Sequence, residues 1–340
     1  ILGGYDFVSR HSDFYTGHNH GTNVLSDIAG YIEGEFIGTA PDASFYLFRS
    51  EDAANETPLE ETLWVEAAEQ ADSLGVDIIN TSLGYTTFDN ASYDYTYDDL
   101  NGRTAFISRG AEIGASRGML LVNAAGNSGN DAWKYLGVPA DAESVFTIGA
   151  VNATETIASF SSFGPTADGR IKPDVLAQGQ GVSVINHISG SAITSNGTSF
   201  SSPVIAGVIA CFWQAFPNKT NFEIMQIIRE SADRYTNPTD HHGYGVPDFK
   251  AAFNTTLSVG QSLSNVLRVF PNPFNDLLWF EGIQTNVNDL KVRISSMLGE
   301  ELIFEKLDDA QCDVSILPPG LYIVEVFTGN SKQVFKLMKQ

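Results

Sequence analysis

The chain contains little cysteine: two residues in 340, Cys211 and Cys312. Cys211 lies within an apolar run and Cys312 in a distant segment of different composition, so we expect no disulfide between them. An unpaired cysteine in an apolar run is typical of a small buried residue, and we expect Cys211 to be one. The fold must then be stabilised by its core, and cysteine usage leaves the cellular compartment open.

Basic residues and long apolar runs are also scarce. The chain has 19 Lys and Arg against 41 Asp and Glu, a formal net charge of −22. A surface that binds nucleic acid must be basic to face the phosphates, so we expect no nucleic-acid partner. No apolar run reaches the roughly 18 residues that a membrane-spanning helix needs, so we expect no membrane span. The acidity fits a soluble, extracellular protein but specifies no partner.

Helix and strand patterns alternate through the first 250 residues. The segments "LEETLWVEAAEQADSLG" (59–75) and "TAFISRGAEIGASRG" (104–118) have helical periodicity and end at glycine. They are followed by the strand-like runs "VDIINTSLG" and "MLLVNAAGN", and "SVFTIGAV" and "GVSVIN" add two more β-branched runs. This alternation predicts an α/β domain in which helices cover both faces of a parallel sheet. Ligands of such sheets bind beyond the carboxyl ends of the strands.

The pattern changes near residue 250. The small, polar segment "NTTLSVGQSLSN" (254–265) is typical of a linker. Short alternating runs separated by turns follow, which predicts a small all-β sandwich. We therefore expect a domain at 1–253, a linker at 254–265 and a β-sandwich at 266–340. A glycan-binding sandwich is one alternative, with Trp279 for stacking, but the apolar neighbours of Trp279 favour a core position.

Three stretches combine residue types that carry acyl-transfer chemistry. His20 begins an amphipathic segment, Asn127 ends a strand in a Gly-rich loop, and Ser199 stands at the start of an apolar helix in "GTSFSSP". A serine nucleophile needs a base such as a neutral imidazole. Its oxyanion needs donors such as an Asn amide and a backbone N–H at a helix start. Each stretch alone also has a structural interpretation, as a helix cap or a turn.

Taken together and in this order, the stretches resemble the subtilisin-like serine proteases, the subtilase family. The resemblance covers about residues 1–250 and includes "HGT" (20–22), "GTAPDA" (38–43), "NTSLG" (80–84), "AAGN" (124–127) and "KPDVLAQG" (172–179). It implies a secreted endopeptidase that cleaves polypeptides through an acyl-enzyme, with Ser199 as nucleophile, His20 as general base and Asn127 as oxyanion donor. It further implies substrate-binding roles for Ser82, Leu83, Gly84, Ala125 and Gly126.

One departure concerns the acid of the catalytic triad. The family places an Asp at the end of a first strand, ahead of the His. Asp6 in "GGYDFVS" and Asp13 neither follow an apolar strand nor precede a glycine. We expect that this chain is N-terminally truncated and lacks that strand and its Asp, with Asp6 as the alternative acid. We also expect no carboxylate at the far ring nitrogen of His20. A catalytically silent, peptide-binding protein of the same fold remains the alternative function.

We expect no cofactor and no metal. His18 and His20 lack the Cys or acidic spacing of a metal site, and His241 and His242 fall in a surface loop. The acidic loop "YDYTYDDLNG" (93–102) could hold the structural calcium common in the family. It has no EF-hand-like spacing, which favours a solvated loop.

The tail carries a second resemblance. "VFPNPFNDLLWFEG", "VRISSMLGEEL" and "ILPPGLYIVEVFTG" resemble the C-terminal sorting domain of the type IX secretion system of Bacteroidota. The resemblance implies that residues 266–340 engage that machinery and that the protein is secreted or held at the cell surface. A third possible function, that of a cell-surface adhesin, would be supported by the tail alone.

Overall fold

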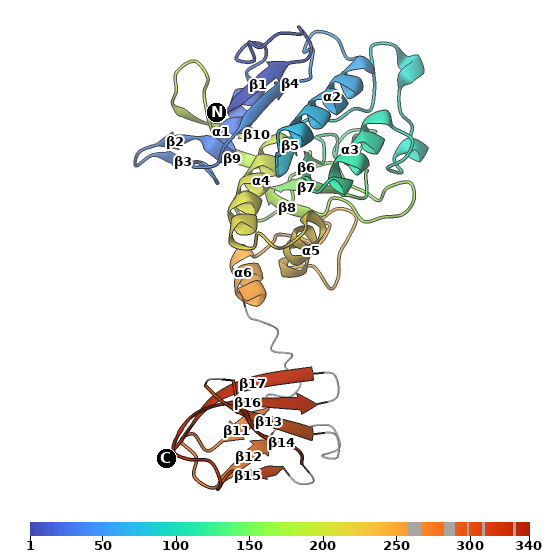
Figure 1. The fold of residues 1–340 in the computed structure, drawn as a ribbon. Helices are drawn as coiled ribbons and strands as arrows, with labels where there is room; N and C mark the ends of the chain where they lie inside the picture. The colour runs from blue at the N-terminus through green and yellow to red at the C-terminus, as the bar shows by residue number, and fades with distance from the viewer. Residues whose placement is uncertain (258–266, 282–289, 298, 308–309, 329–330) are drawn as a thin grey trace. The chain divides into compact units, whose positions relative to one another are not determined.

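The computed structural model describes residues 1–257, 267–281, 290–297, 299–307, 310–328 and 331–340 (Figure 1). The chain divides into two compact units, Ile1–Leu257 and Ser258–Gln340. The first is α/β and the second is all-β, as the sequence pattern predicts. Within the described residues, no helix is both long and apolar enough to cross a membrane.

A four-stranded parallel sheet forms the centre of the first unit. Its strands, in spatial order, are β5 (Ile78–Thr81), β6 (Leu120–Ala124), β7 (Val145–Val151) and β8 (Val175–Gln178). Side chains alternate between the two faces, so that Leu120 and Val122 join one core cluster and Leu121 joins the other. Every residue of β6 and β7 is buried, as expected for strands with helices on both faces.

A separate parallel pair consists of β1 (Gly3–Asp6) and β4 (Tyr46–Arg49). The carboxyl end of β4 lies at the same end of the domain as that of β5, because Glu51 after β4 accepts a hydrogen bond from the Tyr85 hydroxyl after β5 at 2.5 Å. The two strands therefore run in the same direction, but they belong to different sheets.

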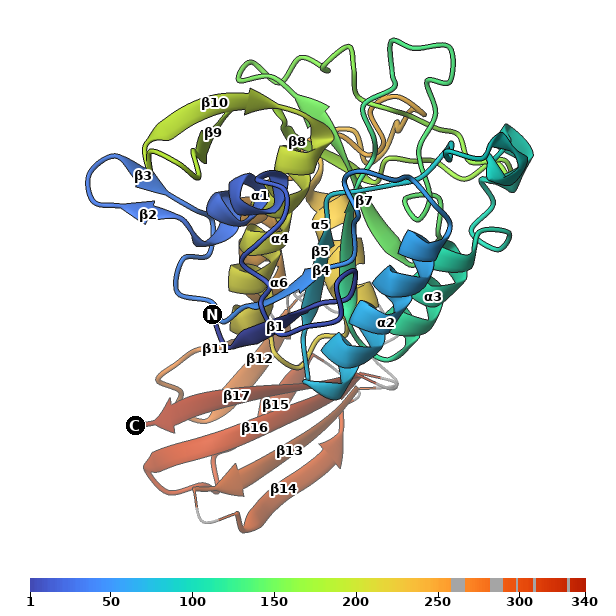
Figure 2. The same cartoon turned by 90° about the horizontal axis from the view of Figure 1, so that it is seen from above.

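Helices cover both faces of the central sheet. On one face α2 (Leu59–Ser73) and α3 (Phe106–Ser116) lie side by side, in the segments where periodicity predicts helices (Figure 2). On the other face the buried α4 (Thr198–Ala215) packs against α1, and α5 and α6 complete this layer. The remaining helices are α1 (His20–Ala29), α5 (Asn221–Ser231), α6 (Phe249–Leu257) and the short 3₁₀ helices η1 (Ala91–Tyr93) and η2 (Tyr97–Asp99).

Two antiparallel hairpins complete the first unit: β2 (Tyr31–Ile32) with β3 (Phe36–Ile37), and β9 (Gln180–Ile185) with β10 (Ala192–Asn196). The second hairpin corrects the prediction that "GVSVIN" adds a strand to the parallel sheet. That place is taken by β8, because a β-branched run does not specify its pairing partner.

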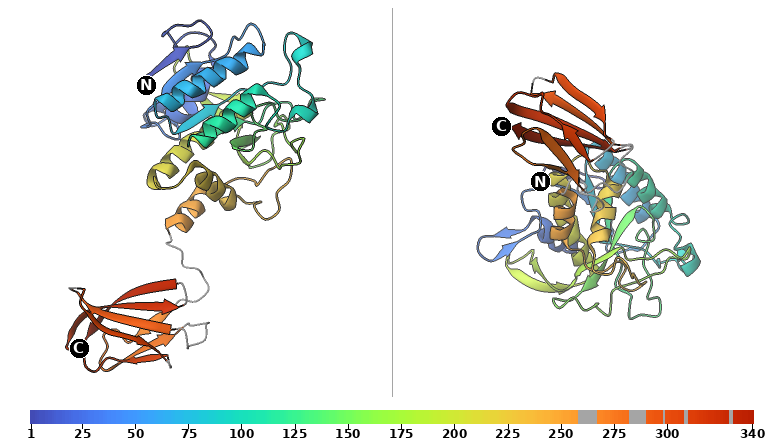
Figure 3. Two further views of the ribbon diagram at one scale, coloured as in Figure 1. Left: turned by 45° about the vertical axis from the view of Figure 1, so that its right-hand side comes forward. Right: turned by 90° about the horizontal axis from the view of Figure 1, so that it is seen from below.

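The second unit consists of two antiparallel sheets around one core (Figure 3). Their strands are β11 (Arg268–Phe270), β12 (Leu277–Glu281) and β15 (Gln311–Asp313) in one sheet, and β14 (Glu301–Lys306), β13 (Leu290–Ser296), β16 (Gly320–Thr328) and β17 (Ser331–Lys339) in the other. The expected core position of Trp279 is wrong. Leu278 and Phe280 fill the core, so the alternation of β12 leaves Trp279 44% exposed.

Two further expectations differ from the structure. Residues 254–257, expected to begin the linker, form the last turn of α6, and 258–265 lie outside the described residues. Cys211 is exposed rather than buried, because the side of α4 on which it lies is open to a cavity. Cys211 and Cys312 are both unpaired thiols.

Candidate active site

One cavity of about 1780 Å³ brings the predicted site residues together. His20 lies at the start of α1, Ser199 in the first turn of α4, and Asn127 in the loop after β6. The predicted substrate-binding residues also line this cavity; they are Ser82, Leu83 and Gly84 after β5, and Ala125 and Gly126 after β6. The loops gather there because the carboxyl ends of parallel strands meet at one edge of a sheet.

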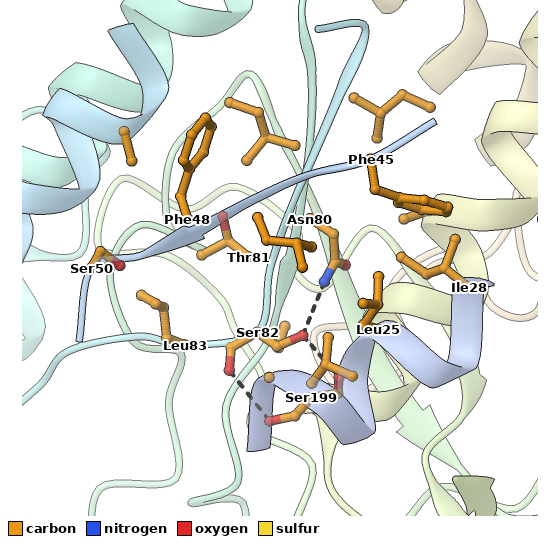
Figure 4. A pocket seen from close by; sticks show the side chains of 18 of the residues that line it. Leu25, Ile28, Phe45, Phe48, Ser50, Asn80, Thr81, Ser82, Leu83 and Ser199 are labelled. Carbon is orange, nitrogen blue, oxygen red and sulfur yellow. Dashed lines mark hydrogen bonds between the residues drawn. The ribbon is translucent and has the colours of Figure 1, made fainter. Parts of the chain in front are cut away.

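Ser199 is presented by a helix that begins one residue earlier than the sequence suggests. The N-cap is Gly197, whose φ of 147° is disfavoured for residues with a side chain. In the first turn of α4, the backbone N–H of Ser199 points along the positive end of the helix. The Ser199 hydroxyl lies 3.5 Å from the Ser82 carbonyl oxygen, and Ser82 Oγ donates back to the Ser199 carbonyl at 2.8 Å (Figure 4).

Asn127 is held by Thr198, a residue that the sequence analysis did not single out. The Thr198 backbone N–H and hydroxyl both donate to Asn127 Oδ1, at 2.8 and 3.1 Å. The same hydroxyl accepts the Gly126 N–H at 3.1 Å. Because Oδ1 must face these donors, the Nδ2 amide is turned away from Thr198, and no described residue accepts a hydrogen bond from it. The sequence did contain a signal for this role, because Thr198 lies between Gly197 and Ser199 in the "GTS" motif.

His20 is half-buried, and burial lowers its pKa, with the neighbouring His18 adding to the shift. Its ring lies 5.9 Å from that of Phe200, the residue after Ser199. A neutral imidazole at neutral pH has the protonation state of a general base. No described carboxylate forms a hydrogen bond or ion pair with His20.

The two candidate acids in the chain are engaged elsewhere. Asp6 is fully buried and accepts hydrogen bonds from Arg49 Nη1 and the Ser9 N–H, both at 2.8 Å. Burial opposes ionisation of Asp6, but these partners outweigh it and its pKa is lowered. Asp13 accepts a long hydrogen bond of 3.3 Å from the Tyr15 N–H. Neither residue orients His20 in this structure.

Most of the remaining candidates from the sequence have local hydrogen-bond partners, whereas the His241 ring packs against Phe163 and its buried Nε2 has none among the described residues. His18 Nδ1 accepts the His20 backbone N–H at 3.1 Å, and His242 pairs with Thr239. In the acidic loop, Asp94 accepts the Phe88 N–H and Asp99 caps η2. Over the described ranges, no cluster of three or more His, Cys, Asp or Glu is placed to hold a metal ion.

The residues predicted as nucleophile, base and oxyanion donor line one cavity of a parallel α/β sheet, which fits the class of the serine hydrolases. Residues 3–246 match the model of the subtilase family, and the chain belongs to that family. Residues 268–340 match the model of the secretion system C-terminal sorting domain.

Curated relatives and solved structures agree with this assignment. The chain is 29% identical to serine protease AprX of Bacillus subtilis (strain 168) over 72% of its own length and 59% of that protein. It is 31% identical to subtilisin DY of Bacillus licheniformis over 72% of this chain and 80% of the relative. The solved structure of the patellamide maturation protease PatA superposes with a TM-score of 0.57 and 25% identity, over 71% of this chain and 85% of that one.

We expect Thr198 to act through Asn127. Thr198→Val removes the hydroxyl that fixes the amide and should lower kcat by about tenfold, while Thr198→Ser should keep it. Asn127→Leu should lower kcat by about 10²–10³, the loss known from a subtilisin when one oxyanion donor is removed. Adding Thr198→Val to Asn127→Leu should cost nothing further. Equal losses in both backgrounds, measured with a chromogenic peptide, would show that Thr198 has a separate role.

Proposed function

We propose that the first unit is a serine endopeptidase that cleaves peptide bonds through an acyl-enzyme on Ser199. Ser199 Oγ attacks the scissile carbonyl carbon while His20 accepts the hydroxyl proton. The negative charge on the carbonyl oxygen is stabilised by Asn127 Nδ2 and the Ser199 backbone N–H. His20 then gives its proton to the leaving amine, and water, activated by His20 in turn, hydrolyses the ester. These steps call for no cofactor.

The observation that carries this proposal is the orientation of Asn127. The two hydrogen bonds from Thr198 direct Nδ2 away from the protein's own acceptors, at the start of the helix that holds Ser199. Asn127 is exposed, so its amide is open to the carbonyl oxygen of a bound substrate. The direct test is hydrolysis of denatured protein and its loss after treatment with a serine-directed sulfonyl fluoride.

The substrate class follows from the shape of the site. The segments after β5 and β6 border an open cavity of about 1780 Å³, which can admit an extended chain. We therefore propose polypeptide substrates without assigning a preferred side chain. A catalytically silent peptide-binding protein is the second candidate, and the observation that favours it is the lack of a carboxylate partner for His20 among the described residues.

We propose that the tail addresses the protein to the type IX secretion machinery, and thus to the medium or the cell surface of a bacterium of the Bacteroidota type. The support is the match of residues 268–340 to the sorting-domain model. The second unit also has a core of its own.

Deleting residues 258–340 should leave peptide hydrolysis within about twofold, because the two units have separate cores. The same deletion should retain the protein inside the native cell, as seen by immunoblots of cells and medium. The matched control is a fusion of residues 258–340 to an unrelated periplasmic protein, which should be exported. Normal secretion of the truncated protein would refute the proposed role of the tail in secretion.

A further inference from the structure

The helix that presents His20 carries a buried carboxyl group without a partner. Asp27 lies seven residues after His20 in α1, and it is only 4% exposed. Its Oδ2 atom is buried and has no hydrogen-bond partner among the described residues. Buried polar atoms are nearly always paired, and the steps of peptide hydrolysis make no use of Asp27. The unpaired oxygen therefore calls for an explanation of its own.

A second buried acceptor lies one turn away on the same side of α1. The Oδ1 atom of Asn23 is also buried, and it too lacks a partner in the part of the chain that the structure describes. Residues four apart on a helix are neighbours, so the side chains of Asn23 and Asp27 are within reach of each other. The cavity is lined instead by Leu25 and Ile28, on another side of α1 (Figure 4).

The elements packed against α1 supply no cation that could pair with an ionised Asp27. These elements are β9 and α4, and Ser26 beside Asp27 accepts the Ile185 N–H of β9 at 2.9 Å. β9 has no ionisable side chain, and α4 has only Cys211. The segments that follow α1 and β9 hold Glu33, Glu35, Asp42 and His187. None of these groups contributes to the pKa of Asp27, which burial alone raises to about 8.

We propose that Asp27 is an un-ionised carboxylic acid in the folded enzyme, which donates its proton to Asn23 Oδ1 and thereby fixes the helix that positions His20. One proton pairs both atoms, because the protonated Oδ2 is the donor that Asn23 Oδ1 lacks. Asp27 lies about 10 Å along the helix axis from the first residue of α1, so it does not reach the reacting atoms. It is a positioning residue that acts through α1.

This arrangement makes α1 sensitive to pH. Ionisation would leave a buried charge beside a second acceptor, which is costly, so α1 opens and exposes the carboxylate to water instead. An exposed Asp has a pKa of about 4, so opening releases a proton above that pH. The opening equilibrium constant of α1 should rise by up to about tenfold per pH unit and level off above the folded pKa of about 8. The open form no longer holds His20 at the cavity, and this last step alone rests on the proposed function.

Hydrogen exchange of the α1 backbone amides at 21–29 measures this opening in residues 1–340. After correction for the intrinsic exchange rate, their protection should fall by up to about tenfold per unit from about pH 6 to about pH 8. Asp27→Asn should abolish this slope, because an amide cannot ionise and its Nδ2 still donates to Asn23 Oδ1. Asp27→Thr, a second variant that keeps a hydroxyl donor, should do the same. Asp72→Asn at an exposed position of α2 is the matched control and should keep the slope; circular dichroism verifies that each variant folds.

Infrared difference spectra between the wild type and Asp27→Asn detect the proton itself. At about pH 6 the wild type should show the C=O stretch of a protonated carboxyl group that the variant lacks. A carboxylate band in its place would mean that the Asn23 amide is turned to donate to an ionised Asp27, and would overturn the proposal. An α1 slope that survives in both Asp27 variants would also overturn it.

These two readouts need no hydrolysis, so their failure is distinguishable from a failure of the proposed peptidase function. The pH profile of kcat adds the test of positioning. Activity of the wild type should decline at alkaline pH, and Asp27→Asn should move that decline to higher pH, whereas Asp72→Asn should not. An alkaline decline that is the same in the wild type and Asp27→Asn would remove Asp27 from the positioning of His20.

Discussion

Replacing Ser199 with alanine should lower kcat for peptide hydrolysis by at least about 10², because losing the nucleophile of a subtilisin costs about 2 × 10⁶ and losing only the acid, which His20 lacks among the described residues, costs about 3 × 10⁴. Without the hydroxyl no acyl-enzyme forms, and only oxyanion stabilisation and binding remain. The measurement is the rate of cleavage of a chromogenic peptide by purified wild type and variant. Binding of an uncleavable peptide should persist, since the cavity walls are unchanged.

The same helix offers a matched control for this experiment. Ser201 is buried, and its hydroxyl donates to the Thr198 carbonyl at 3.0 Å, a bond within the first turn of α4. Ser201→Ala should therefore keep kcat within a few-fold, which separates chemistry from helix stability. Hydrolysis that survives Ser199→Ala, or that is lost equally in Ser201→Ala, would remove Ser199 from the mechanism.

The second large effect should come from removing the general base. His20→Ala should lower kcat by at least about 10², because the nucleophile and the base of a subtilisin act as a unit and losing either costs about as much as losing both. Adding Ser199→Ala to His20→Ala should therefore cost nothing further. His18→Ala is the matched control, because its ring only accepts the His20 backbone N–H at 3.1 Å and kcat should stay within a few-fold.

The pH dependence tests the same role of His20. Burial and His18 lower the pKa of His20, and the base must be neutral, so activity should decline only below the usual histidine range as pH falls. A decline that begins at or above that range would contradict His20 as the base. Loss of activity in an Asp6→Asn variant that still folds would show that Asp6 serves as the acid.

Local periodicity predicted what depends on local sequence. The segments of α2 and α3 and the strands β5, β6 and β7 follow from spacing and glycine stops, and the motifs around His20, Asn127 and Ser199 predicted which loops share a cavity. Which strands pair with one another was harder to predict from the sequence. The run "GVSVIN" has the same β-branched character as β7, yet it pairs with β10 in a hairpin, since pairing is set by the rest of the fold.

The burial of two side chains was predicted wrongly. Cys211 lies in an apolar helix but borders the open cavity, and Trp279 alternates out of the core while Leu278 and Phe280 point in. The role of Thr198 was also missed, because it depends on a hydrogen bond to a residue 71 positions away. Such contacts are properties of the assembled fold and leave no periodic signal.

The most direct measurement is the site of covalent modification by a peptidyl diphenyl phosphonate, located by mass spectrometry of a digest. The reaction uses residues 1–340, with Ser199→Ala as the control. A single adduct on Ser199, formed faster as pH rises through the titration of His20, is the expected result. An adduct on another residue, or none at any pH, would contradict a serine peptidase built on Ser199, His20 and Asn127.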